Sequence, residues 1–354
     1  MWVGVNRTRH TREFASHRGT YPPLLRSCAR PLNALRRRAT LLLLVPLVSL
    51  WASVPAAAQQ VGLSPTLASI QRTHTVRLGF RETAAPFSYL DQANRPIGYS
   101  LELCKAIVEE IGAEVGITNL NIDYVKVTPE TRIPAVLNNK IDLECGSTTA
   151  SPDRARRVAF SPMIYVAGTK LMVPMDSAVS RITDLKGKTI VVTRGTTNER
   201  AIEIADKKFS LGLVMVATTD HEQSFQLLSD GKAQAFATDD ILLYGLIARH
   251  RVQDKFKVVG DFLSYDPYGI MFRKDDPQFA DVVDRTFRRL ATNQDLVLLY
   301  EKWLMNRLPT GEQLGVPMSA ELEHSFKMLA DGAPGTVKGC LLLSVRIEAK
   351  APIT

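Results

Sequence analysis

Hydrophobic and polar positions follow two alternating patterns along residues 61–331. Val76, Leu78 and Phe80 in THTVRLGFRE fall on one face of an extended chain, which predicts a strand. The next segment, SLELCKAIVEEIG, spaces its apolar residues three and four apart and predicts a helix that ends at Gly112. Strand, helix and strand patterns follow in NIDYVKVT, TRIPAVLNN and KIDLECGS. Such alternation is typical of βαβ units with mainly parallel sheets.

A second series repeats this alternation through GKTIVVTRGTTNERAIEIADKK, LVMVATTD, HEQSFQLLSDG and KAQAFATDD. RIPAVLNNKIDLECGSTT and SFQLLSDGKAQAFATDD each run a short amphipathic helix through a polar turn into a strand that ends in a polar cluster. We interpret them as equivalent elements of two similar lobes. FSPMIYVAGTKLMV predicts a crossing between the lobes, GDFLSYDPYGIMFR predicts the return crossing, and two later helical segments complete the first lobe.

The predicted fold class is therefore α/β with two lobes. Each lobe is a mostly parallel sheet flanked by helices, and two crossing strands join the lobes. Lobe 1 is predicted to comprise residues 59–166 and 266–331, and lobe 2 to comprise residues 167–265. Residues 332–354 break the pattern with glycine, proline and a short leucine run, and we leave them as a C-terminal tail of unknown structure.

Residues 1–58 have the layout of an N-terminal extension followed by a secretory signal peptide. Arg36–Arg38 precede an apolar run of about 16 residues and then Ala56–Ala58. A membrane anchor would need about 20 apolar residues, and Pro46 and Pro55 interrupt this run. We expect cleavage after Ala58 and a periplasmic protein. A misassigned translation start would explain the residues ahead of the signal.

The net charge of +8 comes from this leader. Residues 1–58 hold nine arginines and one acid, Glu13, so the rest of the chain has 35 basic and 35 acidic residues. A nucleic-acid-binding protein is expected to keep a basic excess in its folded part. The sequence therefore predicts no nucleic-acid partner.

The remaining cysteines and histidines predict no metal site. Cys104, Cys145 and Cys340 follow the leader, and neither Cys-x-x-Cys nor a zinc-like Cys/His spacing occurs. At most one disulfide can form among three cysteines, and the sequence does not select it. Neither a Gly-x-Ser-x-Gly nucleophile motif nor a phosphate-binding loop is present, so we expect no enzyme and no cofactor.

Polar side chains collect where the predicted strands end. In open α/β sheets, ligands bind beyond the carboxyl ends of the strands. Each of the main predicted strands ends in a group able to bind a small polar ligand, and the start of a helix at TRGTTNERA adds free amides that favour an anion. These strand-end residues are Arg81, Ser147, Thr149, Thr193, Thr196 and Asp239.

The segment ASPDRARR begins a short helix. Ser151 is a predicted N-cap, Pro152 fits the first helical position, and Arg154 follows within the first turn. A cation there is unfavourable unless an anion offsets it, because the helix dipole favours acids at this end. Arg154 is therefore either an anion-binding residue or a partner of a surface acid. Arg156 and Arg157 are expected to be solvated.

Six segments together resemble the periplasmic glutamate/aspartate-binding proteins of ABC amino-acid importers, which are family 3 extracellular solute-binding proteins. They are GFRETAAPFSYLD, GYSLELCKAIVEEI, TRIPAVLNNKIDLECGSTTASPDRARRVAFS, DLKGKTIVVTRGTT, DHEQSFQLLSDGKAQAFATDD and YGIMFRKDDPQF. The likeness extends over about residues 70–310 with the motifs in the same order. It implies the type II periplasmic-binding-protein fold, whose two lobes close on the ligand.

The resemblance also implies roles for individual residues. Arg154 would bind the α-carboxylate of the ligand through its planar guanidinium, and Asp239 would accept the α-ammonium. Hydroxyl and amide groups would complete the carboxylate end, namely those of Ser147, Thr149, Thr193 and Thr196.

Three further residues would surround the side-chain carboxylate of the ligand, namely Arg81, Arg132 and His221. This second cationic group separates the acidic-ligand branch from relatives that bind neutral or basic amino acids. From the residues alone, Arg132 could equally be a cation on a helix surface, and His221 could be a helix-start residue beside Asp220.

Three positions depart from the family pattern. Pro129 stands where relatives offer a serine, and proline has neither a hydroxyl nor an amide hydrogen to donate, so we expect weaker discrimination between aspartate and glutamate. Ile270 stands where the closest relatives carry a cysteine, so Cys145 is not expected to find a disulfide partner there. Arg194 adds a charge near the expected site.

The predicted function is capture of glutamate or aspartate without chemistry, by a monomer that delivers the ligand to the membrane permease of an ABC transporter. Alternatives are a binding protein for another amino acid or dicarboxylate, or a dehydratase-like enzyme on the same fold. In that second case Asp239 or Glu144 would act as general acid or base.

Overall fold

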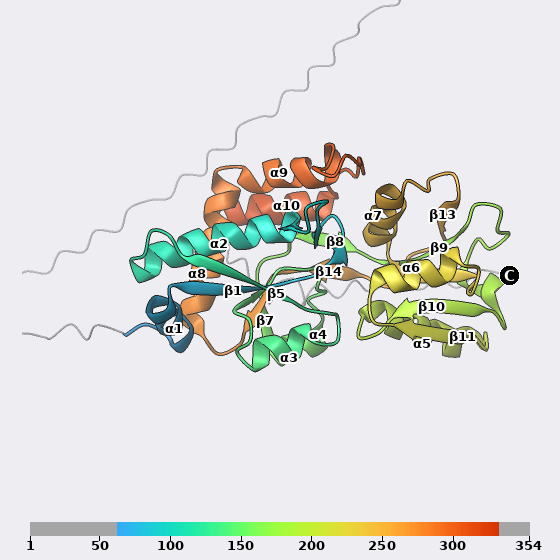
Figure 1. Ribbon diagram of the computed structural model, residues 1–354, viewed down its shortest axis with the longest axis horizontal. Helices are drawn as coiled ribbons and strands as arrows, with labels where there is room; N and C mark the ends of the chain where they lie inside the picture. Colours follow the sequence, from blue (N-terminus) through green and yellow to red (C-terminus); the bar gives the residue numbers. More distant parts are fainter. Residues whose placement is uncertain (1–61, 333–354) are drawn as a thin grey trace, which may run out of the picture. The chain divides into compact units, whose positions relative to one another are not determined.

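The computed structural model describes residues 62–332, and all of them belong to one structural unit (Figure 1). The predicted signal peptide, the cleavage position after Ala58 and residues 333–354 of the predicted tail lie outside the described residues. The described residues are the part of the chain that the alternating pattern predicted to be folded.

One five-stranded sheet has the strand order β5-β1-β6-β15-β7. β1 pairs in parallel with β5 and β6, whereas β15 pairs in antiparallel fashion with β6 and β7. The strands are β1 (Thr75–Phe80), β5 (Asn121–Lys126), β6 (Leu143–Glu144), β7 (Val158–Phe160) and β15 (Met271–Arg273). The last strand returns to this sheet after more than a hundred residues spent elsewhere in the fold.

The second five-stranded sheet has the order β11-β10-β12-β9-β13 and the same pairing directions. Its strands are β9 (Thr169–Pro174), β10 (Thr189–Thr193), β11 (Val214–Thr218), β12 (Ala235–Asp239) and β13 (Phe256–Val259). β6 and β12 occupy the same central position in their sheets. The two segments that we interpreted as equivalent are therefore equivalent in topology.

Two short strands connect the sheets. β8 (Tyr165–Ala167) leads out of the first sheet, β14 (Asp266–Tyr268) leads back, and the two pair in antiparallel fashion. The prediction of an α/β fold with two lobes and two crossing strands is confirmed. We call the part built around the first sheet lobe 1 and the part built around the second sheet lobe 2; the exact predicted boundaries stay a prediction.

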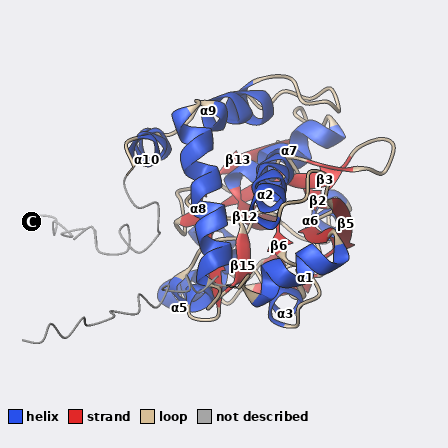
Figure 2. Cartoon of the chain, turned by 90° about the vertical axis from the view of Figure 1, so that its left-hand side faces the viewer, coloured by secondary structure: helices blue, strands red, loops and turns tan. Residues whose placement is uncertain are grey.

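Helices cover both faces of each sheet (Figure 1). Lobe 1 contains α1 (Pro65–Thr73), α2 (Tyr99–Val115), α3 (Arg132–Leu137), α4 (Pro152–Ala155), α8 (Pro277–Thr292), α9 (Asp295–Tyr300), the π-helical turn Glu301–Met305 and α10 (Ala320–Ala330). A small sheet of β2 (Thr83–Ala84), β3 (Ser88–Leu90) and β4 (Pro96–Ile97) follows β1. α8 packs between α2 and α10 (Figure 2).

Lobe 2 contains the short 3-10 helix Ile182–Leu185, α5 (Thr197–Phe209), α6 (His221–Ser229) and α7 (Asp240–His250). Ile190 and Val192 of β10 pack with Ile202 of α5, whereas Val191 packs on the other face with Phe225 of α6. This alternation is the two-residue period of a strand buried on both faces. Within residues 62–332, no helix has the length and apolar character needed to cross a membrane.

The end of α2 differs from the prediction. The helix runs past Gly112 to Val115 and ends at Gly116, whose φ of 73° is left-handed. A Cβ on Gly112 would lie 2.6 Å from the carbonyl oxygen of Ile117. Gly112 is therefore small because the chain leaving the helix passes close to it, and the helix stop that we assigned there belongs to Gly116.

A disulfide joins Cys104 of α2 to Cys145, which follows β6, and both side chains are buried. The sequence left this pairing open. It also predicted that Cys145 would find no partner at position 270, and Ile270 is instead a buried core residue. Cys340 lies outside the described residues.

Candidate ligand-binding site

A small polar cavity lies where the ends of the strands of both lobes meet. Lobe 1 contributes Arg81, Arg132, Ser147 and Thr149, and lobe 2 contributes Thr196, Thr197, Asn198, His221, Asp239 and Leu242. Seven of the nine predicted site residues line this cavity; Thr193 and Arg154 are not among them.

Two arginines form the lobe 1 side of the cavity. Arg81 directly follows β1 and Arg132 is the first residue of α3, and each is only 2% exposed. Burial, and then the charge of Arg132, lower the pKa of Arg81 to about 9, and burial lowers the pKa of Arg132. A pKa near 9 still leaves Arg81 protonated at neutral pH. The site therefore presents two desolvated positive charges.

Three donors around the cavity are without a protein partner. Nη2 of Arg81, Nε of Arg132 and Oγ of Ser147 are buried and have no hydrogen-bond partner among the described residues. A buried polar group left unpaired costs about 1–3 kcal/mol, and more when it is charged. Three such donors lining one cavity indicate a ligand that brings negatively charged or polar acceptor oxygens.

His221 begins α6 and reaches the cavity as a neutral ring. Asp220 caps the helix by accepting a hydrogen bond from the amide of Gln223 at 2.9 Å. Burial, and then the charges of Arg81 and Arg132, hold the pKa of His221 well below its ordinary value. The imidazole therefore offers a hydrogen bond rather than a third charge.

Thr193 forms a hydrogen bond with this imidazole. Its Oγ1 lies 2.8 Å from Nδ1 of His221 and 3.0 Å from Oγ of Ser224, and the side chain is fully buried. The sequence prediction placed Thr193 at the ligand because it ends a strand. In the structure Thr193 does not line the cavity, and its side chain instead contacts His221 and orients the imidazole.

Asp239 ends β12 on the lobe 2 side. Its Oδ1 accepts from Asn198 Nδ2 at 2.8 Å, and its Oδ2 accepts from the hydroxyl of Tyr268 at 2.5 Å. Burial, and then the nearby carboxylate of Asp266, raise the pKa of Asp239 to about 7. A cationic group in the cavity would favour the ionised form of this carboxyl.

Arg154 lies at the junction of the two lobes. Ser151 caps α4 by accepting from the amide of Arg154, as predicted. Nη1 of Arg154 donates to the carbonyl of Thr149 at 3.0 Å, and Nη2 donates to the carbonyl of Gly195 in lobe 2 at 3.3 Å. Burial, and then Arg132, lower its pKa to about 9. Arg156 is exposed, as predicted, and pairs with Asp153.

The beginning of α5 forms much of the lobe 2 wall. Thr196 is its N-cap, accepting from the amide of Glu199 at 3.1 Å. Thr197 lies beside Thr149, and the buried Asn198 joins Asp239 to Thr169 and Thr238 through its amide. The prediction omitted Thr197, Asn198 and Leu242. A polar residue in the first turn after a predicted strand end was the available signal for Asn198.

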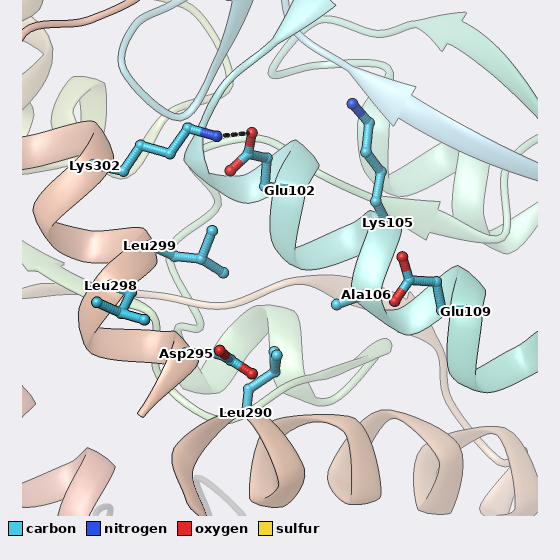
Figure 3. A pocket seen from close by; sticks show the side chains of 9 residues that line it. All are labelled: Glu102, Lys105, Ala106, Glu109, Leu290, Asp295, Leu298, Leu299 and Lys302. Atoms are coloured by element: carbon cyan, nitrogen blue, oxygen red, sulfur yellow. Dashed lines mark hydrogen bonds and ion pairs between the residues drawn. The ribbon is translucent and has the colours of Figure 1, made fainter. Parts of the chain in front are cut away.

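A wider hollow lies between α2 and α9, with a mixed lining of leucines and charged side chains (Figure 3). Lys302 and Glu102 form an ion pair across it at 2.6 Å. None of the residues that line it has an unpaired buried polar atom among the described residues. The chemistry of a specific small-ligand site therefore belongs to the smaller cavity. Within residues 62–332, no group of three His, Cys, Asp or Glu side chains is arranged to bind a metal ion.

Two α/β lobes joined by two crossing strands, with a buried polar cavity lined by both, define a solute-binding protein of the periplasmic type. The family model for bacterial extracellular solute-binding proteins, family 3, matches residues 76–306, and the chain belongs to this family. This confirms the resemblance seen in the sequence motifs.

Two relatives align with most of this chain. The L-glutamate/L-aspartate-binding protein of Pseudomonas aeruginosa is 38% identical over 299 residues, covering 84% of this chain and 98% of the relative. The glutamate/aspartate import solute-binding protein of Escherichia coli is 34% identical over 300 residues, covering 84% and 99%. A solved structure of a mutant of ArgBP from T. maritima superposes with a TM-score of 0.61 at 26% identity, covering 67% of this chain and 98% of that one.

Proposed function

We propose that this protein captures an acidic amino acid, glutamate or aspartate, in the cavity between its lobes. The observation that carries the proposal is the set of three unpaired buried donors, on Arg81, Arg132 and Ser147. Two of them are on positively charged groups, which matches a carboxylate. The names of the relatives from Pseudomonas aeruginosa and Escherichia coli support the same ligand class.

The side-chain carboxylate of the ligand is assigned to the end of the cavity with Arg81, Arg132 and His221. Arg81 and Arg132 each keep a free N–H there, and the neutral His221 adds a hydrogen bond without adding charge. Charge-assisted hydrogen bonds between guanidinium and carboxylate are about twice as strong as neutral ones. Two guanidinium groups also disfavour a basic side chain, so arginine and lysine are poor ligands in this proposal.

The amino-acid end of the ligand is assigned to the opposite side. Asp239 accepts the α-ammonium, which would replace the proton that its raised pKa favours. Arg154 binds the α-carboxylate, using guanidinium N–H groups other than those that donate to Thr149 and Gly195. The remaining contacts are assigned to Ser147, Thr149 and Thr196, with Thr193 acting through His221.

Closure of the lobes is the proposed mechanism of capture. Neither lobe alone supplies both the arginine pair and Asp239, so the full set of contacts exists only when the lobes come together. A ligand that binds only this form shifts the balance towards it by its differential affinity. No bond in the ligand is made or broken.

Delivery to an ABC importer completes the proposal. The chain is exported with the predicted signal peptide removed after Ala58, acts as a periplasmic monomer, and presents its closed, loaded form to the membrane permease. The signal-like leader and the word "import" in the name of the Escherichia coli relative support this assignment.

A ligand screen tests the proposal. Melting temperature and calorimetric titration of the purified mature chain are measured with glutamate, aspartate, glutamine, asparagine and arginine. Glutamate or aspartate should raise the melting temperature most, since a ligand that binds only the folded state stabilises it. Failure of both acids to bind, or stronger binding of arginine, would contradict the proposal.

Catalysis is the second candidate, and Asp239 is the observation that favours it. A carboxyl with a pKa of about 7 beside the hydroxyl of Tyr268 has the properties of a general acid or base. Prolonged incubation with each amino acid, followed by mass spectrometry, separates the two candidates. Recovery of unchanged ligand is expected.

A further inference from the structure

Thr148 and Glu144 form a hydrogen-bonded chain behind the arginine pair, and neither residue lines the cavity. Nη1 of Arg132 donates to Oγ1 of Thr148 at 2.5 Å, and Oγ1 of Thr148 donates to Oε2 of Glu144 at 2.5 Å. Both Thr148 and Glu144 are fully buried. A hydroxyl has only one proton, so the proton that Thr148 gives to Glu144 leaves its lone pairs to face the guanidinium.

This chain fixes the orientation of the Arg132 guanidinium. Nη1 is also directed at the carbonyl of Ser147 at 3.3 Å. Nε has no partner among the described residues and is the N–H left for a ligand. Because the guanidinium is planar, fixing Nη1 also fixes the direction of Nε.

Glu144 also supplies a negative charge to the arginine pair. Its carboxylate acts against burial to raise the pKa values of Arg81 and Arg132. The chain is packed tightly around this acid: a Cβ on Gly146 would lie 2.4 Å from Oε1 of Glu144 and 2.9 Å from Cγ of Arg81. Glycine at 146 thus lets the carboxylate and the Arg81 stem approach the same point of the backbone.

We infer that Thr148 and Glu144 are positioning residues that aim Arg132 at the side-chain carboxylate of the ligand, and that this aim gives the site its preference for acids over amides. The inference rests on the proposed function. A carboxylate gains most from a correctly directed guanidinium N–H, because both partners are charged. The amide of glutamine or asparagine gains less from the same contact, so misdirecting Arg132 should affect acids more than amides.

Three variants test the inference, with affinities for glutamate, aspartate, glutamine and asparagine measured by calorimetry. Thr148→Val removes the hydroxyl and keeps the volume; it should weaken glutamate binding at least about tenfold, equivalent to 1.4 kcal/mol, and weaken glutamine binding by a smaller factor. Thr148→Ser is the matched control, because it keeps the hydroxyl. Its affinities for glutamate and for glutamine should both stay within about threefold of wild type.

Glu144→Gln separates position from charge. The amide oxygen can still accept the Thr148 proton, so the preference for acids should change less than in Thr148→Val. The melting temperature without ligand should fall, because two buried guanidinium groups lose the negative charge that favours them most.

The results can separate the inference from the proposed function. If wild type binds no acidic amino acid, the proposed function fails first. If wild type binds glutamate and Thr148→Val either matches Thr148→Ser or weakens glutamate and glutamine equally, Thr148 has only a structural role and the inference is wrong. A larger loss of acid preference in Glu144→Gln than in Thr148→Val would also overturn it, because the charge of Glu144 rather than the direction of Arg132 would then account for the effect.

Discussion

The hydroxyl of Thr149 in lobe 1 lies 3.1 Å from the hydroxyl of Thr197 in lobe 2. Thr149 also reaches Oδ1 of Asp266, at the start of the returning strand, at 3.1 Å. This contact lies at the wall of the cavity and connects the segment after β6 to the first residue of α5, which belong to different lobes. It therefore exists only while the two lobes are together, and it can contribute to ligand affinity without contacting the ligand.

Thr197→Val should weaken ligand binding by about fivefold. A typical hydrogen bond contributes about 1 kcal/mol, and its loss here falls on the closed form alone. The control is Thr219→Val, at an exposed threonine that bonds only within its own lobe, to Gln223 at 3.0 Å. Calorimetric titration with glutamate should show the loss in the first variant and no comparable loss in the second. Equal affinities would show that the Thr149–Thr197 contact does not contribute to closure.

Arg154→Ala should weaken glutamate binding at least about a hundredfold. Removing one partner of a buried charge pair costs about 3–5 kcal/mol, and each 1.4 kcal/mol is a factor of ten in affinity. The loss of the hydrogen bond to Gly195 adds to this effect, because that bond also joins the lobes.

Arg156→Ala is the matched control for this variant. Arg156 lies in the turn that follows α4, but its side chain is exposed and pairs with Asp153. Exposed ion pairs contribute little, so affinity should stay within about twofold of wild type. A loss of less than fivefold in Arg154→Ala would remove Arg154 from the proposed ligand contacts.

Glutamate affinity should fall as pH falls from about 7 to 5. The pKa of Asp239 is raised from 3.8 to about 7 in the folded protein, so without ligand the carboxyl takes up a proton over this range. An α-ammonium beside Asp239 requires the ionised form, so binding below pH 7 must expel that proton. Glutamate affinity can fall by at most about tenfold per pH unit, because binding expels one proton. The carboxylates of the ligand stay ionised over most of this range.

The same shift affects stability in the absence of ligand. Between about pH 4 and 7 the folded state binds more protons than the unfolded state, so the contribution of Asp239 to the free energy of unfolding declines as pH rises. Asp239→Asn should bind glutamate weakly at every pH and lose this pH dependence. An unchanged slope in Asp239→Asn would assign the titration to another group.

Reduction of the Cys104–Cys145 disulfide should lower the melting temperature by roughly 10 °C. The bridge closes a loop with a sequence separation of 41, which the chain-entropy model values at about 4 kcal/mol. The double variant Cys104→Ser and Cys145→Ser should melt at a similarly low temperature and should not respond to reductant. A wild-type melting temperature that does not change on reduction would contradict the expected contribution.

Gly146→Ala should damage the site more than its size suggests. The added methyl group would displace the carboxylate of Glu144 and the stem of Arg81, so glutamate affinity and melting temperature should both fall. Gly62→Ala is the control, since a Cβ there meets nothing within 4 Å. Wild-type binding by Gly146→Ala would show that the arginine pair tolerates displacement.

The fold could be predicted from the sequence because its signals are local. The two-residue period of β1 and the strand-end positions of Arg81, Ser147 and Asp239 follow from short segments and from the rule that ligands bind beyond the carboxyl ends of strands. Arg132 and His221 became candidates only through the family resemblance, because nothing in their own segments separates a buried contact from a helix-surface residue.

The remaining features could not be predicted because they depend on distances between segments that are remote in the sequence. Thr193 ends a strand as several of the proposed ligand contacts do, and only its approach to His221, 28 residues later, shows that it contacts the ring. The Cys104–Cys145 pairing requires a helix and a strand end to be placed side by side. The hydrogen bonds that link Arg132, Thr148 and Glu144 could not be predicted either. Thr148 and Glu144 occur in a strand-end segment that contains many polar residues, and the sequence does not distinguish them from the others.

The paired strands β8 and β14 share only three residue pairs, from Asp266 with Ala167 to Tyr268 with Tyr165. Both chain passages between the sheets run through this short ladder, so any change in the angle between the lobes must act on these two strands. Tyr268 is part of this ladder and also donates to Asp239. The carboxylate proposed to bind the ammonium therefore lies one hydrogen bond from the strands that join the sheets, so movement of the lobes would act directly on that contact.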